Sequence, residues 1–394
     1  MISSDYYIED NSDMENKKLE AARNHYMNGD YASALNLYLS LVNANISYKL
    51  YHRIAKCYYK MGDFKQAEDN FLKSVNLEKG ENPSYIYLGN LAYKKEDIRN
   101  AIYYWACAFA YKPDDDLVCL NLATSYFSCG MKFQSVFYYE KYLKYAQDRG
   151  SSYTAVKQSL DEYSKIGNDF LQKAKASILR KDYKTAIEFL TFAYKNLPTN
   201  YDINMLLGTA YLAENDNMHA MIYLKQAYCI NKKSTEVLQM LTSVFINLGD
   251  YTAAYCSLRR LLPLVINNQE EYLKTMQVIK ELNSTFDEQS YRGHKEWGDN
   301  YFRENNYHFA LFEYENCTLL NESMNSELAD KIQQLTLFIN PETNIIKTYM
   351  AKADSLYKKG DIKNANKYFS KVILYSDPET NEYKLAKARV ANAG

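Results

Sequence analysis

A pattern of small, bulky and polar residues returns along this chain with a period of about 34 residues. In residues 51–71, YHRIAKCYYKMGDFKQAEDNF, a helical apolar pattern is followed by a Gly-Asp-aromatic triplet, and an Ala then precedes a bulky residue by four positions. Related segments lie at 21–38, 88–105 and 207–224. A period of this length is typical of a solenoid built from helix–turn–helix pairs. The sequence therefore predicts an array of short helices.

The copies can be placed by aligning the polar break between the two predicted helices. They begin near residues 15, 48, 82, 116, 167, 201, 235, 291 and 346. The steps are 33 or 34 residues inside each block and 51, 56 and 55 residues between blocks. The long steps leave inserts at 150–166, 269–290 and 325–345, and the last two have the i, i+4, i+7 apolar spacing of helices.

Each recurring residue type has a predicted packing role. Small residues on the first helix let two helices cross closely, and Ala residues on the second helix do the same, because a larger side chain would push the helices apart. The bulky residue one turn after each Ala fills the gap to the next pair. Glycines before the second helix permit a sharp turn. The small residues of the first helices are at positions 55, 89, 123, 174, 208, 298 and 353. The alanines of the second helices are Ala34, Ala67, Ala101, Ala186, Ala220, Ala254, Ala310 and Ala365. The turn glycines are Gly29, Gly62, Gly130, Gly249 and Gly360.

The third copy shows the pattern most completely. It contains Tyr85, Leu88, Gly89, Ala101, Trp105, Ala108 and Pro113. In these residues the chain resembles the tetratricopeptide repeat (TPR) family. The resemblance covers roughly three quarters of the chain and implies an all-α fold, a right-handed α–α superhelix (solenoid) of about nine repeats with extra linking helices.

The same register gives the expected domain organisation. Successive helices in such a stack run in alternating directions, and a single added helix would reverse this order. Each insert therefore prolongs a neighbouring helix, forms a degenerate half-repeat or bends the stack. We favour a half-repeat or a bend. Because a linear array couples only neighbouring repeats, we expect weak interfaces near 150–166 and 269–290. The expected segments are a disordered acidic tail (1–14), repeats 1–4 (15–149), a linking helix (150–166), repeats 5–7 (167–268), a linking helix (269–290), repeat 8 (291–324), a linking helix (325–345), repeat 9 (346–380) and a capping helix (381–394).

Bulk composition excludes several classes of protein. The net charge of −1 and the 24% of charged residues do not indicate a nucleic-acid or anionic-membrane binder. The longest nearly apolar run, 101–110, is too short to span a membrane. Seven cysteines without a C-x-x-C pair favour a reduced, cytoplasmic setting.

No residue pattern predicts catalysis. Motifs for dinucleotide binding, phosphate loops, zinc proteases and serine hydrolases are absent, and the five histidines have no His or Cys three or four residues away. We therefore expect no catalytic, cofactor-binding or metal-binding residues, no cofactor and no enzyme activity.

The first helices of such pairs line a groove, and the register predicts the residues that face it. In the first three copies these residues form a basic stripe with aromatic neighbours, which suits an extended partner segment bearing carboxylates. They are Arg23, Tyr26, Lys56, Tyr59, Lys60, Asn90, Tyr93 and Lys94. The alternative is a solvated face that merely follows the family pattern. Copies five to seven give a mostly neutral lining of Lys175, Ile178, Met205, Thr209, Leu212, Gln239, Ser243 and Ile246.

One specialised use of the family fold is not expected. Members that clamp the C-terminal carboxylate of heat-shock chaperones use Lys and Asn, then Asn, then Lys and Arg on three successive first helices. Asn90 and Asn121 match two of these five positions, whereas Ile86, Asn168 and Gln172 depart from the pattern.

The sequence predicts a non-catalytic scaffold or adaptor that binds another protein, without a membrane. The alternatives are a single-stranded RNA-binding helical-repeat protein, which the absence of a recurring polar pair disfavours, and an accessory subunit of a separately encoded enzyme. As a comparison for the basic stripe, we expect Lys225 and Lys232 to lie on second helices or in the following turn, away from packing positions.

Overall fold

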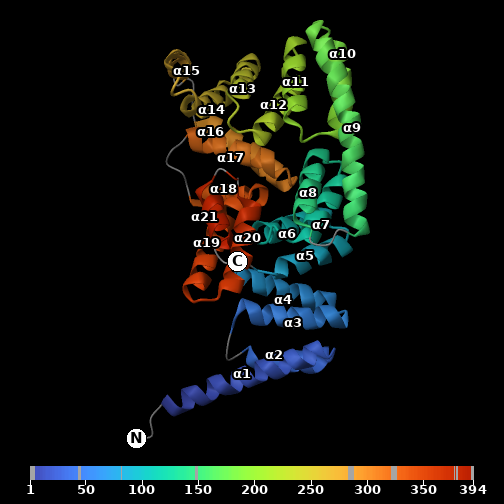
Figure 1. Cartoon of the computed structure of the whole chain (residues 1–394), viewed down its shortest axis with the longest axis vertical. Helices are drawn as coiled ribbons and strands as arrows, with labels where there is room; N and C mark the ends of the chain where they lie inside the picture. Colours follow the sequence, from blue (N-terminus) through green and yellow to red (C-terminus); the bar gives the residue numbers. More distant parts are fainter. Residues whose placement is uncertain are drawn as a thin grey trace. The chain divides into compact units, whose positions relative to one another are not determined.

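The structure is a computed structural model that describes residues 5–42, 46–80, 82–146, 150–282, 288–320, 326–376, 378 and 380–391. Within these ranges it contains α-helices labelled α1 to α21, one short 3₁₀ helix and no strand (Figure 1). The predicted all-α repeat fold is confirmed. No helix among the described residues is both long and apolar enough to cross a membrane.

The chain divides into two compact units, residues 1–113 and 114–394, which are described separately. The amino-terminal unit holds the first three repeats as three helix pairs. Its helices are α1 (Asp5–Met27), α2 (Tyr31–Leu41), α3 (Tyr48–Met61), α4 (Phe64–Leu77), α5 (Ser84–Lys94) and α6 (Ile98–Tyr111). Residues 5–14 belong to the predicted disordered tail, but in the structure they form the start of α1, which begins at Asp5. The sequence from Asp5 to Met27 contains no Pro or Gly that would interrupt a helix.

The carboxy-terminal unit holds the remaining repeats. Its pairs are α7 (Asp116–Ser128) with α8 (Lys132–Tyr145), α9 (Ser151–Leu179) with α10 (Tyr183–Asn196), α11 (Tyr201–Ala213) with α12 (Asn217–Ile230), α13 (Thr235–Asn247) with α14 (Tyr251–Leu261), α16 (Glu288–Arg303) with α17 (Tyr307–Leu320), and α19 (Glu342–Lys358) with α20 (Ile362–Tyr375). The other elements are the 3₁₀ turn η1 (Leu262–Leu264), α15 (Gln269–Leu282), α18 (Ser326–Ile339) and α21 (Asn381–Ala391).

The aspartate of the repeated triplet caps the second helix. Asp63 lies just before α4, and its side chain accepts a hydrogen bond from the backbone N–H of Gln66 at 3.1 Å. This bond satisfies one of the free N–H groups at the start of a helix. The same cap is made by Asp30, Asp97, Asp182, Asp216, Asp250 and Asp361. In the fourth repeat Met131 occupies this position and makes no side-chain cap.

The residue before the aspartate turns the chain with a positive φ. Gly62 has φ 84°, and the other four turn glycines have values between 73° and 82°. The remaining repeats force the same conformation on residues with a side chain, namely Glu96, Lys181, Asn215 and Asn305. The role predicted for the glycines is thus observed, although the turn does not require glycine in every repeat.

Small residues lie where helices cross closely, as predicted. All eight alanines of the second helices are fully buried. A Cβ on Gly89 would stand 2.4 Å from Trp105, and one on Gly208 would stand 2.4 Å from Leu224. The bulky residue therefore packs directly onto the small residue of its own pair, not only toward the next pair. These contacts fix the spacing of the α5–α6 and α11–α12 pairs.

The three inserts differ from one another. Residues 150–166 are continuous with the following first helix, because α9 runs unbroken from Ser151 to Leu179; the favoured bend or half-repeat is wrong there, and the prolonged helix is correct. Gly167 lies inside α9, where a Cβ would stand 2.7 Å from Leu197. The other two inserts supply the separate helices α15 and α18.

Helix α21 covers the end of the last pair. Ala386 is fully buried among residues of α19 and α20, and Arg389 lies 4.6 Å from the ring centre of Tyr357. This is the position expected for a cap on the final repeat.

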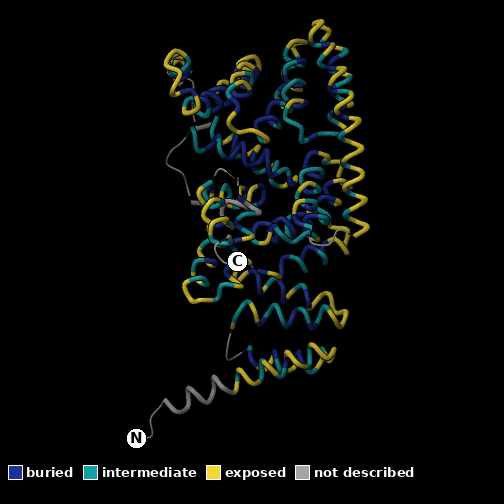
Figure 2. The backbone as a smooth tube through the Cα atoms, viewed as in Figure 1, coloured by how far each residue is buried: buried dark blue, intermediate teal, exposed yellow. Residues whose placement is uncertain are grey.

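Helix α17 is buried on nearly every side in the carboxy-terminal unit (Figure 2). Its residues contact α12 through Glu313 and α14 through Asn316, and the turn before it contacts α7, since Tyr126 donates to the carbonyl of Asn305 at 3.1 Å. Its sequence, YHFALFEYENCTLL, is mostly apolar and contains no Lys or Arg, as suits a helix buried on nearly every side, and its buried Glu313 is paired with Lys225. The expectation that repeats contact only their neighbours is wrong for this unit, because α17 joins helices from four repeats (Figure 1).

Candidate functional site

The eight predicted groove residues all lie on first helices of the amino-terminal unit. Arg23 and Tyr26 are on α1, three residues are on α3, and three are on α5. Arg23, Lys60, Tyr93 and Lys94 are exposed, and the other four are half-buried.

A small cavity lies where α1 and α3 meet. Its volume is about 270 Å³, and its walls include Tyr26, Tyr38 and Arg53 together with the predicted Arg23 and Lys56. The Lys56 ammonium lies 5.0 Å from the ring centre of Tyr26, close enough for a cation–π contact. The cavity thus combines aromatic walls with three cationic side chains.

Positive charge is concentrated at this cavity. Burial lowers the pKa of Arg53, and the neighbouring charge of Arg23 lowers it further. Burial and the charge of Lys60 lower the pKa of Lys56 in the same way. None of these four side chains has an ion-pair partner among the described residues. Like charges held together without a counter-ion would be stabilised by a bound anion.

The stripe continues from α3 to α5 through aromatic contacts. The rings of Tyr59 and Tyr87 are 5.3 Å apart, and Tyr87 stacks on Phe71 at 4.9 Å. The Lys94 ammonium lies 4.0 Å from the ring centre of Phe64. His52 packs beside this cluster; burial, then the charges of Lys56 and Arg53, lowers its pKa to about 4, so its imidazole is neutral at pH 7. The charge of the stripe therefore comes from Lys and Arg.

The far end of the stripe is held by Trp105. Its indole N–H donates to the side-chain oxygen of Asn90 at 3.2 Å, and its ring lies 5.7 Å from that of Tyr93. Tyr93 nevertheless remains 52% exposed. An oriented amide and an exposed aromatic ring therefore follow the cationic part of the stripe.

Sequence reasoning missed three residues of this surface. Arg53 was overlooked although it precedes Lys56 by three positions and so shares its helix face. Tyr38, one of the predicted packing residues, also forms a wall of the cavity. Tyr87 joins α3 to α5.

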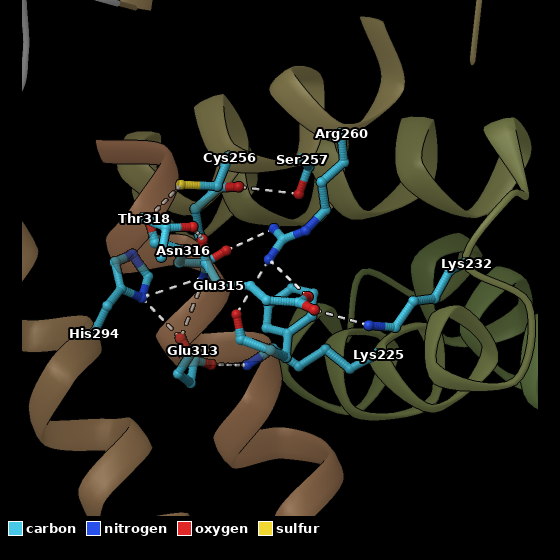
Figure 3. A network of polar contacts seen from close by, with 12 residues as sticks. Lys225, Lys232, Cys256, Ser257, Arg260, His294, Glu313, Glu315, Asn316 and Thr318 are labelled. Atoms are coloured by element: carbon cyan, nitrogen blue, oxygen red, sulfur yellow. Dashed lines mark hydrogen bonds and ion pairs between the residues drawn. The ribbon is translucent and has the colours of Figure 1, made fainter. Parts of the chain in front are cut away.

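Charges in the carboxy-terminal unit are arranged differently, around α17 (Figure 3). The Lys225 ammonium donates to Glu313 at 2.5 Å, and His294 contacts the other oxygen of Glu313 at 2.7 Å. Burial alone would raise the pKa of Glu313, but Lys225 and His294 lower it to about 2. Arg260 donates to Asn316 at 2.6 Å. This network ties α12, α14 and α16 to α17.

The network corrects one expectation. Lys225 lies on the second helix α12, as the register predicts, but it is only 2% exposed and is a packing residue. Lys232 follows α12 and donates to Glu315 at 2.8 Å.

Two polar residues of the predicted neutral lining already have partners in neighbouring helices. Lys175 donates to Asp202 at 3.3 Å, and Gln239 donates to Glu271 at 2.5 Å. This surface offers fewer unpaired groups than the stripe on α1, α3 and α5.

Cysteine and metal chemistry find little support in the geometry. Burial raises the pKa of Cys57 to about 11 and of Cys256 to about 12, which keeps both as thiols. Among the described residues, no group of three or more His, Cys, Asp or Glu side chains could hold a metal ion.

Comparisons with known proteins agree with the repeat. Residues 48–80 and 346–377 match the family model described as tetratricopeptide repeat, and these bounds begin where the second and ninth predicted copies begin. No curated protein matches the chain significantly.

Among the solved structures to which the chain is similar are several described as TPR proteins. A tetratricopeptide repeat protein from Parabacteroides merdae is 10% identical with a TM-score of 0.31, covering 68% of this chain and 98% of its own. The TPR domain of P58(IPK) is 14% identical with a TM-score of 0.27, covering 96% and 99%. The TPR2AB domain of yeast Sti1, in a complex with pHSP90, is 13% identical with a TM-score of 0.29, covering 69% and 99%. The two matched segments, together with the small-to-bulky packing of the α5–α6, α11–α12 and α16–α17 pairs, identify tetratricopeptide repeats in this chain, and a fold of such repeats generally serves as a protein–protein interaction scaffold.

Proposed function

We propose that this protein is a non-catalytic scaffold or adaptor whose amino-terminal unit binds an acidic segment of a partner protein along α1, α3 and α5. One observation carries the proposal. Arg23, Arg53, Lys56, Lys60 and Lys94 lie on these three first helices, and none has an ion-pair partner among the described residues.

The chemistry of the stripe favours carboxylates in an extended chain. Arg23, Arg53 and Lys56 surround the cavity and can donate charge-assisted hydrogen bonds. Beyond them, Asn90 is held by Trp105, and Tyr93 offers an exposed ring to an apolar side chain of the partner. Electrostatic attraction would draw an acidic segment in, and the aromatic residues would select its neighbours.

The proposed compartment is the cytoplasm, supported by a sequence in which none of the seven cysteines lies in a C-x-x-C pair. Absence of catalysis is part of the proposal; burial raises the pKa of Cys57 and of Cys256, which disfavours these two thiols as nucleophiles.

The test uses fluorescence anisotropy with a labelled oligoglutamate peptide and the full chain. The double variant Lys56→Glu, Lys60→Glu should nearly abolish binding, because two new anions would repel a carboxylate by several kcal/mol at close range. Lys65→Glu with Lys79→Glu is the matched control, since both lysines are exposed and lie on α4 or just after it. Both variants should remain folded.

Three results would contradict the proposal. Equal loss in both double variants would show diffuse attraction to net charge. Full binding by Lys56→Glu, Lys60→Glu would place the site elsewhere. Tight binding of labelled oligouridine, with strong salt dependence and no peptide binding, would favour the RNA-binding class.

A further inference from the structure

A second cavity lies in the carboxy-terminal unit, apart from the basic stripe. Its volume is about 340 Å³, and it is formed by the end of α12 with the turn that follows, by α17 and by the end of α18. Phe312 and Ile339 give it apolar walls, and Lys232, Lys233 and His308 contribute polar groups. This volume lies within the range of small-molecule sites.

The charges at the cavity do not balance. Glu315 is the carboxylate in its wall, and it already has two cationic partners, Lys232 at 2.8 Å and Arg260 at 3.7 Å. The side chain of Lys233 is exposed and has no ion-pair partner among the described residues. Three cations thus accompany one carboxylate, while the neighbouring Glu313 is matched by Lys225. The excess positive charge favours an anion.

The side chain of His308 also lacks a partner. It is 8% exposed, and its ring packs edge-on against Phe133 and Phe137 at 5.3 Å from each. No described residue makes a hydrogen bond with its ring nitrogens. Because His308 lines the cavity, its ring nitrogens are available to hydrogen-bond with a group bound there. Burial, then the charges of Lys232 and Lys141, lowers the pKa of His308 to about 4, so a neutral ring can donate one N–H.

We propose that this cavity binds an organic anion, a carboxylate or phosphate group on a small apolar body. Lys232 and Lys233 would hold the charged group, His308 would donate to it, and Phe312 with Ile339 would contact the apolar body. The anion could belong to a free small molecule or to an acidic or phosphorylated side chain of a partner. Since its walls come from α12, α17 and α18, the ligand would also stabilise the contacts around α17.

The experiment titrates phenyl phosphate into the full chain by calorimetry, with inorganic phosphate and sodium chloride at equal ionic strength as comparisons, and follows thermal unfolding in parallel. Phenyl phosphate should bind and raise Tm more than either salt. Lys233→Gln should weaken binding by about tenfold or more, the usual effect of losing one charge-assisted hydrogen bond. Lys184→Gln, an exposed lysine on α10, is the matched control and should bind like the wild type.

His308→Leu provides a second variant, which keeps the contacts with Phe133 and Phe137 but removes the ring nitrogens. It too should weaken binding. If it does not fold, the exposed Lys233 still decides the question. No heat and no rise in Tm with phenyl phosphate, or equal binding by Lys233→Gln and Lys184→Gln, would overturn the proposal.

A phosphoserine peptide separates the two sources of the anion. Binding about tenfold tighter than phenyl phosphate, lost in Lys233→Gln, would identify a partner side chain; weaker binding than phenyl phosphate would identify a free small molecule. Lys56→Glu with Lys60→Glu should leave phenyl phosphate binding unchanged, so this inference can fail or hold independently of the proposed peptide stripe.

Discussion

Lys56 and Lys225 show how one repeat pattern serves two purposes in this protein. Lys56 lies on the first helix α3, half-buried, with other cations beside it and no carboxylate partner among the described residues. Lys225 lies on the second helix α12 and is buried against Glu313. The repeat itself does not decide between these environments. What decides is whether a later helix returns to cover the surface, as α17 does in the carboxy-terminal unit.

The largest expected effect tests the buried pair directly. Lys225→Ala should destabilise the carboxy-terminal unit by about 3–5 kcal/mol, because Glu313 would remain as a buried charge without its closest cation. Lys56→Ala should change stability by no more than about 0.5 kcal/mol. Urea unfolding of both variants measures the contrast. Similar small effects would show that α17 does not bury its charges as described.

The next effect depends on pH. The folded pKa of His308 is about 4, below its ordinary 6.5, so the unfolded chain binds a proton that the folded chain does not. Stability should therefore fall as pH drops from 6.5 towards 4, by up to about 3 kcal/mol for this residue. Glu313, with a folded pKa of about 2, should lose its contribution only below its ordinary 4.5. His308→Leu should flatten the slope between pH 6.5 and 4.5 in urea-unfolding free energies; an unchanged slope would contradict the buried neutral imidazole.

Overfilling a helix crossing should affect both units alike. Ala101 and Ala220 are fully buried in the two units, and Leu at either position should cost about 1–3 kcal/mol. Denaturant unfolding of the two variants gives the comparison. Unchanged stability in one of them would show that its pair is packed differently from the common pattern.

The smallest effect concerns the helix caps. Asp63→Ala removes the cap of α4 and should cost about 1 kcal/mol, whereas Met131→Asp should add a cap to α8 and stabilise by a similar amount. Thermal unfolding with opposite shifts in Tm would support this. Destabilisation by Met131→Asp would show that the fourth repeat uses a different turn.

Local features were predictable from the sequence because each repeat encodes them within a few residues. The cap of Asp63, the turn at Gly62 and the close crossing at Gly89 all follow from the repeated pattern. The position of α17 could not be predicted in this way, because Glu313 and Lys225 are 88 residues apart and no period relates them. The sequence did indicate that this helix needs cationic partners from other helices, because residues 307–320 contain two glutamates and no Lys or Arg.

The candidate stripe could be predicted in part for the same reason. Register along a helix gave Arg23, Lys56 and Lys94, but the aromatic contacts of Tyr87 depend on how α3 and α5 pack. Continuity of α9 did not follow from the repeat register, which begins the fifth copy near residue 167; Gly167 lies inside the helix and allows a close contact with Leu197.

The pairing of Lys225 with Glu313 also imposes an order on biosynthesis. A ribosome that adds about 5–20 residues per second needs roughly 4–18 seconds to extend the chain from one residue to the other. During that interval the second-helix surface around Lys225, with Tyr228 and Arg260, has no α17 to cover it. In the first three repeats this delay does not arise, because the helix that covers each surface is synthesised within one repeat. A nascent chain stalled before residue 313 should therefore expose an apolar, positively charged surface that a chaperone could bind.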